Sequence, residues 1–436
     1  MDRLVYNKLV EWKQLPDAER KPLIVQGARQ VGKTWLLETF GRQEFESVAE
    51  INFEEQKQFV SLFEADFDTD RILRTIQFAT GVTLKPGKTL IIFDEIQEAP
   101  RGLLALKYLL KHAPQYHIVA AGSLLGVALH QEESFPVGKV TFLDVYPLSF
   151  EEFLMAMGQA DMVALLRQSD WETIRLFKER FIDYLRQYYY VGGMPEVVQT
   201  YVMTHNLAKV RKVQQDLLRS YDRDFSKHPP VEMVPRLKMV WNNIGAQLAK
   251  ENKKFIYNAV RKGARAKDFE LAIEWLVNAG AVYKVTRVRQ VSLPLKGFED
   301  MDVFKLFTVD IGLLGAMVGL DEKTLLSGNE IFTQYKGALT EQYVLQQLKC
   351  EEGLVIHYWA SDSGMAEVDF VIQMDGRIVP VEVKAEENLK SKSLKSYNDK
   401  YKPALSVRMS MSDFRREPTL TNLPLYAANW LKNLVV

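Results

Sequence analysis

The sequence is poor in cysteine and histidine, has no excess of charge of either sign and contains no long apolar run. Its one cysteine, Cys350, excludes an internal disulfide, and its six histidines lack the spacing of zinc ligands. Because 56 Lys and Arg balance 56 Asp and Glu, the net charge excludes a surface that is strongly basic as a whole and would bind nucleic acid through that charge. The most apolar stretch, Ile118 to Leu129, is too short to cross a bilayer. The first residues, MDRLVYNKLVEWKQ, alternate charged and apolar side chains, so we expect no signal peptide. We therefore expect a cytoplasmic protein with no membrane partner.

What is present is the composition of a folded protein, with 47% hydrophobic and 26% charged residues in a chain of 436. Short apolar segments alternate with helical stretches over the first 150 residues, which predicts a parallel α/β sheet covered by helices on both faces. The expected strands span residues 22–26, 48–53, 89–93, 116–121 and 139–145.

The segment GARQVGKT fits the phosphate-loop pattern G-x-x-x-x-G-K-[ST] in full, between an apolar strand and a helix. In this arrangement backbone N–H groups face the phosphates of a nucleotide. Lys33 reaches the β- and γ-phosphates, and the Thr34 hydroxyl binds Mg²⁺. The expected nucleotide-binding residues are Gly27, Ala28, Arg29, Gln30, Val31, Gly32, Lys33 and Thr34.

A second element of such a site is the apolar segment TLIIFDEIQ, which ends in two carboxylates. We assign Asp94 to Mg²⁺ and Glu95 to the attacking water as a general base. Ser123 follows the next strand, HIVAAGS, where it would lie between the loop and Glu95 and contact the γ-phosphate or the water. A solvated strand end for Asp94 and Glu95, and a simple turn for Ser123, are the alternatives.

Together GARQVGKT, LIIFDEIQ, AAGSLLG and YPLSFEEF resemble the AAA-type ATPases of bacteria and archaea that carry a C-terminal domain of unknown function. GGMPEVV, RSYDRDF and FTVDIGLL extend the resemblance over nearly the whole chain, although Ala28 stands where such proteins commonly have proline. The resemblance implies adenine as the base, and the N-K-x-D motif of small GTPases is absent. It also implies a helical lid, a winged-helix-like domain and a nuclease-like end after the ATPase core.

The patterns place these parts in order along the chain. Helical periodicity follows residue 150 and stops at His228-Pro229-Pro230, after which helices and a β-rich stretch follow in winged-helix order. We expect an ATPase core at residues 1–150, a helical lid at 151–228, a winged-helix-like domain at 229–320 and a restriction-endonuclease-like α/β domain at 321–436.

Near the C-terminus, EVDFVIQMDGRIVPVEVKA reads as a hairpin that turns at Asp375-Gly376. Its alternation places Glu382 and Lys384 on one face, with Asp369 at the start of the partner strand. This arrangement resembles the restriction-endonuclease-like nuclease core, where two carboxylates hold a divalent metal and a lysine steadies the water or the scissile phosphate. Glu341 matches the additional acidic residue of many such nucleases. A charged sheet edge is the alternative.

Other charged residues are candidates for contacts with partners. One group could contact a phosphate backbone or could be a solvated face: lysines 390, 392, 395, 400 and 402. A second group could contact a DNA backbone or a protein: Arg261, Lys262, Arg265 and Lys267. Arg219 and Arg223 are candidates for an arginine finger, with a salt-bridged helix surface as the alternative.

Two functions follow from these features. The first is an ATPase with Mg²⁺ whose nuclease-like domain acts on or binds DNA or RNA. The second is a nucleotide-dependent switch in which ATP changes homo-oligomeric assembly and the C-terminal domain only binds a partner. The LSGGQ-type signature of transporter ATPases is missing.

Overall fold

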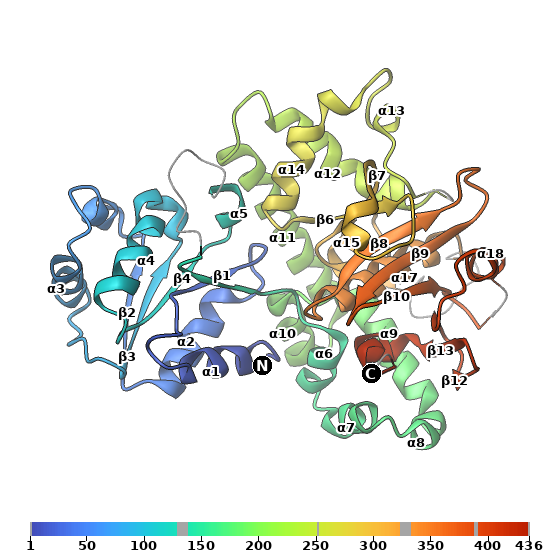
Figure 1. Cartoon of the computed structure of the whole chain (residues 1–436), viewed down its shortest axis with the longest axis horizontal. Helices are drawn as coiled ribbons and strands as arrows, with labels where there is room; N and C mark the ends of the chain where they lie inside the picture. Colours follow the sequence, from blue (N-terminus) through green and yellow to red (C-terminus); the bar gives the residue numbers. More distant parts are fainter. Residues whose placement is uncertain (1, 129–137, 251–252, 323–332, 388–390, 435–436) are drawn as a thin grey trace. The chain divides into compact units, whose positions relative to one another are not determined.

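The protein is represented by a computed structural model that describes residues 2–128, 138–250, 253–322, 333–387 and 391–434 (Figure 1). The chain forms two compact units. The N-terminal unit holds Asp2–Tyr146 and the short segment Asn278–Ala281, and the C-terminal unit holds Pro147–Val277 and Val282–Val436. In the part of the chain that is described, no helix has both the length and the apolar character needed to span a bilayer.

The N-terminal unit is built on a five-stranded sheet in the order β2-β3-β4-β1-β5, and all of its pairs are parallel. This confirms the predicted sheet core. The strands begin and end within two residues of the predicted limits, because buried parallel strands are continuous apolar runs. They are β1 (Leu23–Gln26), β2 (Ser47–Asn52), β3 (Thr89–Asp94), β4 (His117–Ala121) and β5 (Thr141–Asp144).

Helices cover both faces of this sheet. One face, formed by alternate strand residues such as Ile51 and Phe93, packs against α3, α4 and the 3-10 helix η1. On the other face α2 approaches so closely that a Cβ on Gly41 would lie 2.6 Å from Cγ2 of Val48. The helices are α1 (Tyr6–Gln14), α2 (Lys33–Glu44), η1 (Lys57–Phe63), α3 (Thr69–Thr80), η2 (Ile96–Glu98), α4 (Pro100–His112) and α5 (Leu125–Ala128).

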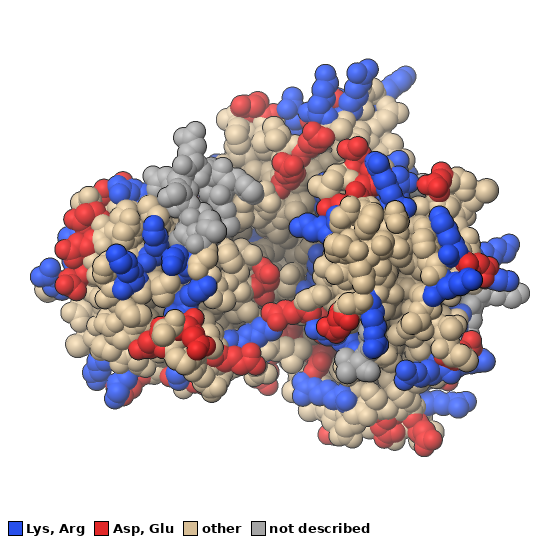
Figure 2. Space-filling view, viewed as in Figure 1, with Lys and Arg blue, Asp and Glu red and all other residues tan. Residues whose placement is uncertain are grey.

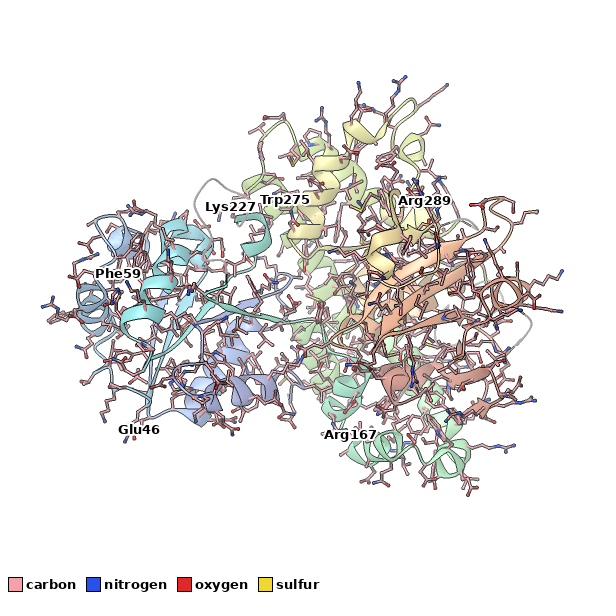
Figure 3. The ribbon with its side chains drawn as sticks, in the orientation of Figure 1. Glu46, Phe59, Arg167, Lys227, Trp275 and Arg289 are labelled. Atoms are coloured by element: carbon pink, nitrogen blue, oxygen red, sulfur yellow. The ribbon has the colours of Figure 1, made fainter. Side chains whose placement is uncertain are left out.

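The two ends of the sheet differ in chemistry. At the amino ends of β2 and β3, Glu46 forms ion pairs with Lys85 at 3.3 Å and Lys88 at 2.6 Å (Figure 3). These three side chains are about half exposed. The residues predicted to bind nucleotide lie instead at the carboxyl ends of β1, β3 and β4, as is usual for ligand sites of open parallel sheets.

The C-terminal unit begins with a helical region. Its first helix starts with a capping box, in which the Ser149 hydroxyl accepts from the N–H of Glu152 and the Glu152 carboxylate accepts from the N–H of Ser149. The helices are α6 (Phe150–Ala156), α7 (Ala160–Gln168), α8 (Trp171–Leu176), α9 (Lys178–Val191), α10 (Pro195–Thr204), α11 (Leu207–Lys227), α12 (Val234–Leu248), α13 (Tyr257–Val260), η3 (Ala266–Asp268), α14 (Glu270–Asn278), η4 (Leu295–Phe298), α15 (Ile311–Met317), α17 (Thr333–Lys349), α18 (Lys392–Tyr401) and η6 (Leu425–Leu434).

An eight-stranded mixed sheet follows, in the order β12-β13-β11-β10-β9-β8-β6-β7. The hairpin β9-β10 has the predicted turn, with positive φ at Asp375 and Gly376. The hairpin β6-β7, expected as the wing of a winged helix, extends the same sheet by pairing with β8, so the sheet crosses the expected boundary at residue 320. The strands are β6 (Val282–Val288), β7 (Glu299–Thr308), β8 (Val355–Ala360), β9 (Glu367–Met374), β10 (Arg377–Val383), β11 (Ser406–Ser410), β12 (Arg415–Arg416) and β13 (Leu420–Pro424).

Asp310, from the segment FTVDIGLL, forms a buried polar centre in this unit. Its carboxylate accepts from the N–H groups of Gly193 and Leu313 at 2.6 and 3.0 Å and from Nε2 of Gln346 at 3.0 Å. A Cβ on Gly192 would lie 2.2 Å from Asp310 Oδ1. The Asp310 carboxylate therefore links the segments GGMPEVV and FTVDIGLL. A side chain at position 192 would collide with this carboxylate, so glycine is required there.

Candidate nucleotide site and carboxylate cluster

The phosphate loop joins β1 to α2 through two glycines whose backbone conformations favour glycine. Gly27 has φ +148°, and a Cβ there would lie 2.1 Å from the carbonyl oxygen of Val145. Gly32 has φ +89° and caps α2 without a side-chain hydrogen bond. The first N–H groups of α2 are thus left to an anion from outside the helix.

Lys33, the first residue of α2, is buried, with 7% of its surface exposed. Its Nζ donates to the carbonyl oxygens of Gly27 and Ala28 at 2.9 and 2.8 Å. Burial lowers the pKa of Lys33 to about 8, although Glu95 and Asp94 favour its charged form. The ammonium group therefore lies against the loop that would hold the phosphates.

Thr34 and Asp94 lie close enough to share one ligand. Thr34 Oγ1 is 3.4 Å from Asp94 Oδ2, and that oxygen also accepts from Nδ2 of Asn52 at 3.1 Å. Burial, with the repulsion of Glu95, raises the pKa of Asp94. A hydroxyl and a carboxylate at the phosphate loop are the oxygen ligands that Mg²⁺ prefers, so these two residues fit the ion.

Glu95 follows β3 in a left-handed conformation, with φ 49° and ψ 46°. Its Oε2 accepts from the N–H and the Oγ of Ser123, both at 3.3 Å, and from Nε2 of Gln97 at 2.5 Å. Because β4 lies between β1 and β3, Ser123, which follows β4, lies between the ends of these two strands. Its contact with a γ-phosphate or with water stays a prediction.

Sequence reasoning missed two residues of this site, Asn52 and Gln97. Asn52 could have been found, because it is the polar last residue of β2 and β2 is the neighbour of β3. Gln97 gave no such signal. Its side chain turns toward Glu95 only because η2 begins immediately after that residue.

The C-terminal unit brings four of the predicted residues together. Asp369 on β9 shares a hydrogen bond with Glu341 of α17, and Asp369 Oδ2 accepts from the N–H of Val383 at 2.7 Å. Glu382 Oε1 pairs with Lys384 Nζ at 2.7 Å. Glu382 Oε2 is buried and has no hydrogen-bond partner among the described residues.

Two lysines that the sequence did not suggest complete this carboxylate cluster. Lys305 of β7 is fully buried, and its Nζ lies 3.5 Å from Glu341 Oε2 and 2.5 Å from Glu367 Oε1. Lys253 pairs with the other oxygen of Glu341. We use the name carboxylate cluster for Lys253, Lys305, Glu341, Glu367, Asp369, Glu382 and Lys384.

The electrostatics of the carboxylate cluster are those of an ion-pair network. Burial raises the pKa of Glu341, but Lys253 and Lys305 outweigh it and lower that pKa to about 2. Burial, with the repulsion of Glu341 and Glu382, raises the pKa of Asp369 well above its usual range. Three lysines lie among the four carboxylates of the cluster and pair with Glu341, Glu367 and Glu382. Within the described residues, no group of three or more His, Cys, Asp or Glu side chains is arranged to hold a metal ion.

The other charged candidates lie on the surface. Arg219 on α11 pairs with Asp216 at 2.9 Å, as expected of a salt-bridged helix surface, and with Arg223 it lines an open pocket of about 810 Å³. Lys and Arg gather over the part of the C-terminal unit that carries α13 (Figure 2). In that part, Nη2 of Arg261 lies 3.8 Å from Oδ1 of Asp268. Lys390 falls outside the described residues, and the other lysines of its group lie on or next to α18.

A five-stranded parallel sheet with a phosphate loop after β1 and an Asp-Glu pair at the end of β3 defines a P-loop NTPase. Comparison with protein families agrees. Residues 19–154 match the AAA domain family, and residues 182–324 and 336–427 match two domains of unknown function, DUF8612 and DUF4143. The chain therefore carries an AAA domain at residues 19–154, followed by matches to two domains of unknown function.

Similarity to individual proteins is distant, and no curated protein matches the chain. Among solved structures, the Walker-type ATPase PABY2304 of Pyrococcus abyssi shares 15% identity and a TM-score of 0.44, over 73% of this chain and 95% of its own. PCH-2 of C. elegans shares 14% identity and a TM-score of 0.23, over 37% and 46%. The signal transduction ATPase (STAND) protein PH0952 of Pyrococcus horikoshii, which has a tetratricopeptide repeat sensor, shares 14% identity and a TM-score of 0.24, over 81% and 46%.

Proposed function

We propose that the N-terminal unit binds and hydrolyses ATP. The observation that carries this proposal is the meeting of Thr34 with Asp94, and of Glu95 with Ser123, beside the phosphate loop. A hydrolase needs a phosphate cradle, a place for Mg²⁺ and a base for water, and the carboxyl ends of three neighbouring strands supply all three.

Each residue has a distinct part in this reaction. Lys33 leaves the carbonyl oxygens of the loop to bind the phosphates, which are stronger acceptors. Thr34 and Asp94 would hold Mg²⁺, which when bound neutralises charge that develops on the phosphates. Glu95 accepts a proton from the attacking water, and Ser123 holds the Glu95 carboxylate in place.

The test is the steady-state ATPase rate of the wild type, Lys33→Ala and Glu95→Gln, with Lys88→Ala as the matched control. Lys88 pairs with Glu46 at the opposite end of the sheet, so its loss should leave the rate unchanged. Lys33→Ala should lose ATP binding, whereas Glu95→Gln should keep binding and lose about 10²-fold or more in rate. Equal rates for the wild type and Lys33→Ala would refute the proposal.

For the C-terminal unit, we propose that the carboxylate cluster acts on nucleic acid with a divalent metal. The convergence of Glu341, Asp369, Glu382 and Lys384 supports this, as does the orphaned Oε2 of Glu382, which offers a buried ligand atom. In the described structure these carboxylates are not arranged around one ion, so Glu341 and Glu382 would have to exchange their lysine partners for the metal before they could hold it together with Asp369. Lys384 would contact the scissile phosphate. When bound, the metal would activate water for attack on phosphorus.

Cleavage of plasmid, linear and single-stranded DNA and of RNA, with Mg²⁺ or Mn²⁺, tests this second proposal. Asp369→Ala with Glu382→Ala should abolish cleavage, whereas Asp362→Ala, an exposed turn residue, should not. If the wild type cleaves nothing, binding by the wild type at fixed low salt decides whether nucleic acid is a partner. ATP-dependent assembly without any effect of nucleic acid would favour the nucleotide switch.

A further inference from the structure

Gln97 contacts Glu95, the base proposed for ATP hydrolysis. Its Nε2 donates to Glu95 Oε2 at 2.5 Å, the shortest of the three hydrogen bonds to that oxygen. All three donors act on Oε2. No hydrogen bond to Glu95 Oε1 is present among the described residues, so this oxygen stays available to accept from water.

The space for the Gln97 amide is provided by Gly122, at the end of β4. A Cβ on Gly122 would lie 2.0 Å from Gln97 Oε1, which no real contact allows. Gly122 does not have a positive φ, so its backbone conformation does not require glycine, and the side chain of Gln97 would have to shift if a Cβ were added there. Gln97 Oε1 is also buried without a hydrogen-bond partner in the part of the chain that is described. Burying the Gln97 carbonyl oxygen without a partner costs free energy, so packing alone does not explain a glutamine at this position.

We infer that Gln97 is a positioning residue for ATP hydrolysis. It fixes Oε2 of Glu95 so that Oε1 faces the attacking water. The inference rests on the ATPase activity proposed above and adds to it a residue that touches neither phosphate nor Mg²⁺ ligands. Because Gln97 acts through Glu95, its loss should lower the rate of the chemical step and leave the affinity for ATP unchanged.

The experiment compares Gln97→Met, which keeps the volume and loses the donor, with Gln97→Ala, in the full-length chain. The rate constant kcat is measured with ATP, and Kd with a hydrolysis-resistant ATP analogue. Both variants should lose about tenfold or more in kcat, with Kd within about twofold of the wild type. A role in packing alone would leave Gln97→Met close to the wild type, and that result would overturn the inference.

Gly122→Ala provides the second arm. Its methyl group should displace the Gln97 amide and reproduce the loss in kcat, but should add nothing further in the Gln97→Ala background. Losses that multiply in the double variant would contradict the inference, as would a parallel rise in Kd for Gln97→Met. If Lys33→Ala hydrolyses ATP as fast as the wild type, the ATPase proposal fails and this inference fails with it. If only Lys33→Ala is inactive and Gln97→Met is normal, the inference alone fails.

Discussion

Replacing Lys305 with methionine tests how the carboxylate cluster is stabilised. Lys305 is fully buried and is the one cation that contacts both Glu341 and Glu367 within the described residues. Methionine keeps much of the volume of the side chain but removes the charge. Of its two lysine partners Glu341 would then keep Lys253, and Glu367 would lose its 2.5 Å ion pair.

Removing one partner of a buried ion pair leaves an uncompensated charge and typically costs about 3–5 kcal/mol. We expect Lys305→Met to lower the free energy of unfolding by that amount at neutral pH. The pKa of Glu341 is about 2 in the folded chain and 4.5 for a glutamate outside the folded environment. Its ionisation therefore stabilises the fold above pH 4.5, and this contribution is lost as the pH falls toward 2. The cost of Lys305→Met should be full at neutral pH and smaller below pH 4.5.

The assay is urea denaturation followed by circular dichroism at neutral pH and near pH 4. Lys284→Met is the matched control, because Lys284 lies on the neighbouring strand, its Nζ lies over the ring of Phe304, and no salt bridge to it is present among the described residues. It should cost no more than about 0.5 kcal/mol. Adding Glu341→Gln to Lys305→Met should recover part of the loss. A loss below about 1 kcal/mol for Lys305→Met would refute the buried ion-pair network.

Three further predictions concern other parts of the chain. His117 is buried against Trp12 and Phe45, and burial lowers its pKa to about 4. Because the unfolded chain binds the proton at a higher pH than the folded chain, the free energy of unfolding should fall by about 3 kcal/mol between pH 6.5 and 4. His117→Phe should remove this loss in urea titrations across that range. Asp310→Ala should cost about 3 kcal/mol in urea denaturation, since it leaves three buried donors unpaired, and an unchanged midpoint would contradict its place in the core. Asp94→Ala should lower the ATPase rate by about 10²-fold or more and remove its dependence on Mg²⁺ concentration, which a magnesium titration of the rate would reveal.

The N-terminal sheet was predictable because its signals are local. Each strand is a short apolar run, and the phosphate loop marks the turn after β1, so the order of elements and the position of Asp94 followed from the sequence. The same holds for the hairpin at Asp375-Gly376, whose turn residues accept positive φ. The direction of the Gln97 side chain in η2 depends on the left-handed backbone conformation of Glu95. The periodicity of the sequence does not reveal that conformation. Gln97 was therefore missed.

The C-terminal sheet was predictable only in part, because its pairings are distant in sequence. The β-rich stretch after the helices of the expected winged-helix-like domain predicted a hairpin, but nothing in it shows that β6 pairs with β8, where Arg287 lies opposite Tyr358. The winged-helix-like and nuclease-like divisions remain predictions. The sheet itself is continuous across them, since a strand edge pairs with whichever partner the fold provides.

That continuity also explains why the motif D…E-x-K is ambiguous in sequence. The hairpin supplies Asp369, Glu382 and Lys384, but β7 supplies Lys305, and Lys305 reaches the carboxylates only because β7 belongs to the same sheet. A motif confined to the hairpin cannot reveal a cation that arrives from a segment more than 60 residues upstream. Lysines pair with Glu341, Glu367 and Glu382 without any metal, which is the arrangement of a buried ion-pair network. Activity in the wild type, lost with Asp369→Ala and Glu382→Ala, is the observation that would separate a catalytic site from a buried ion-pair network.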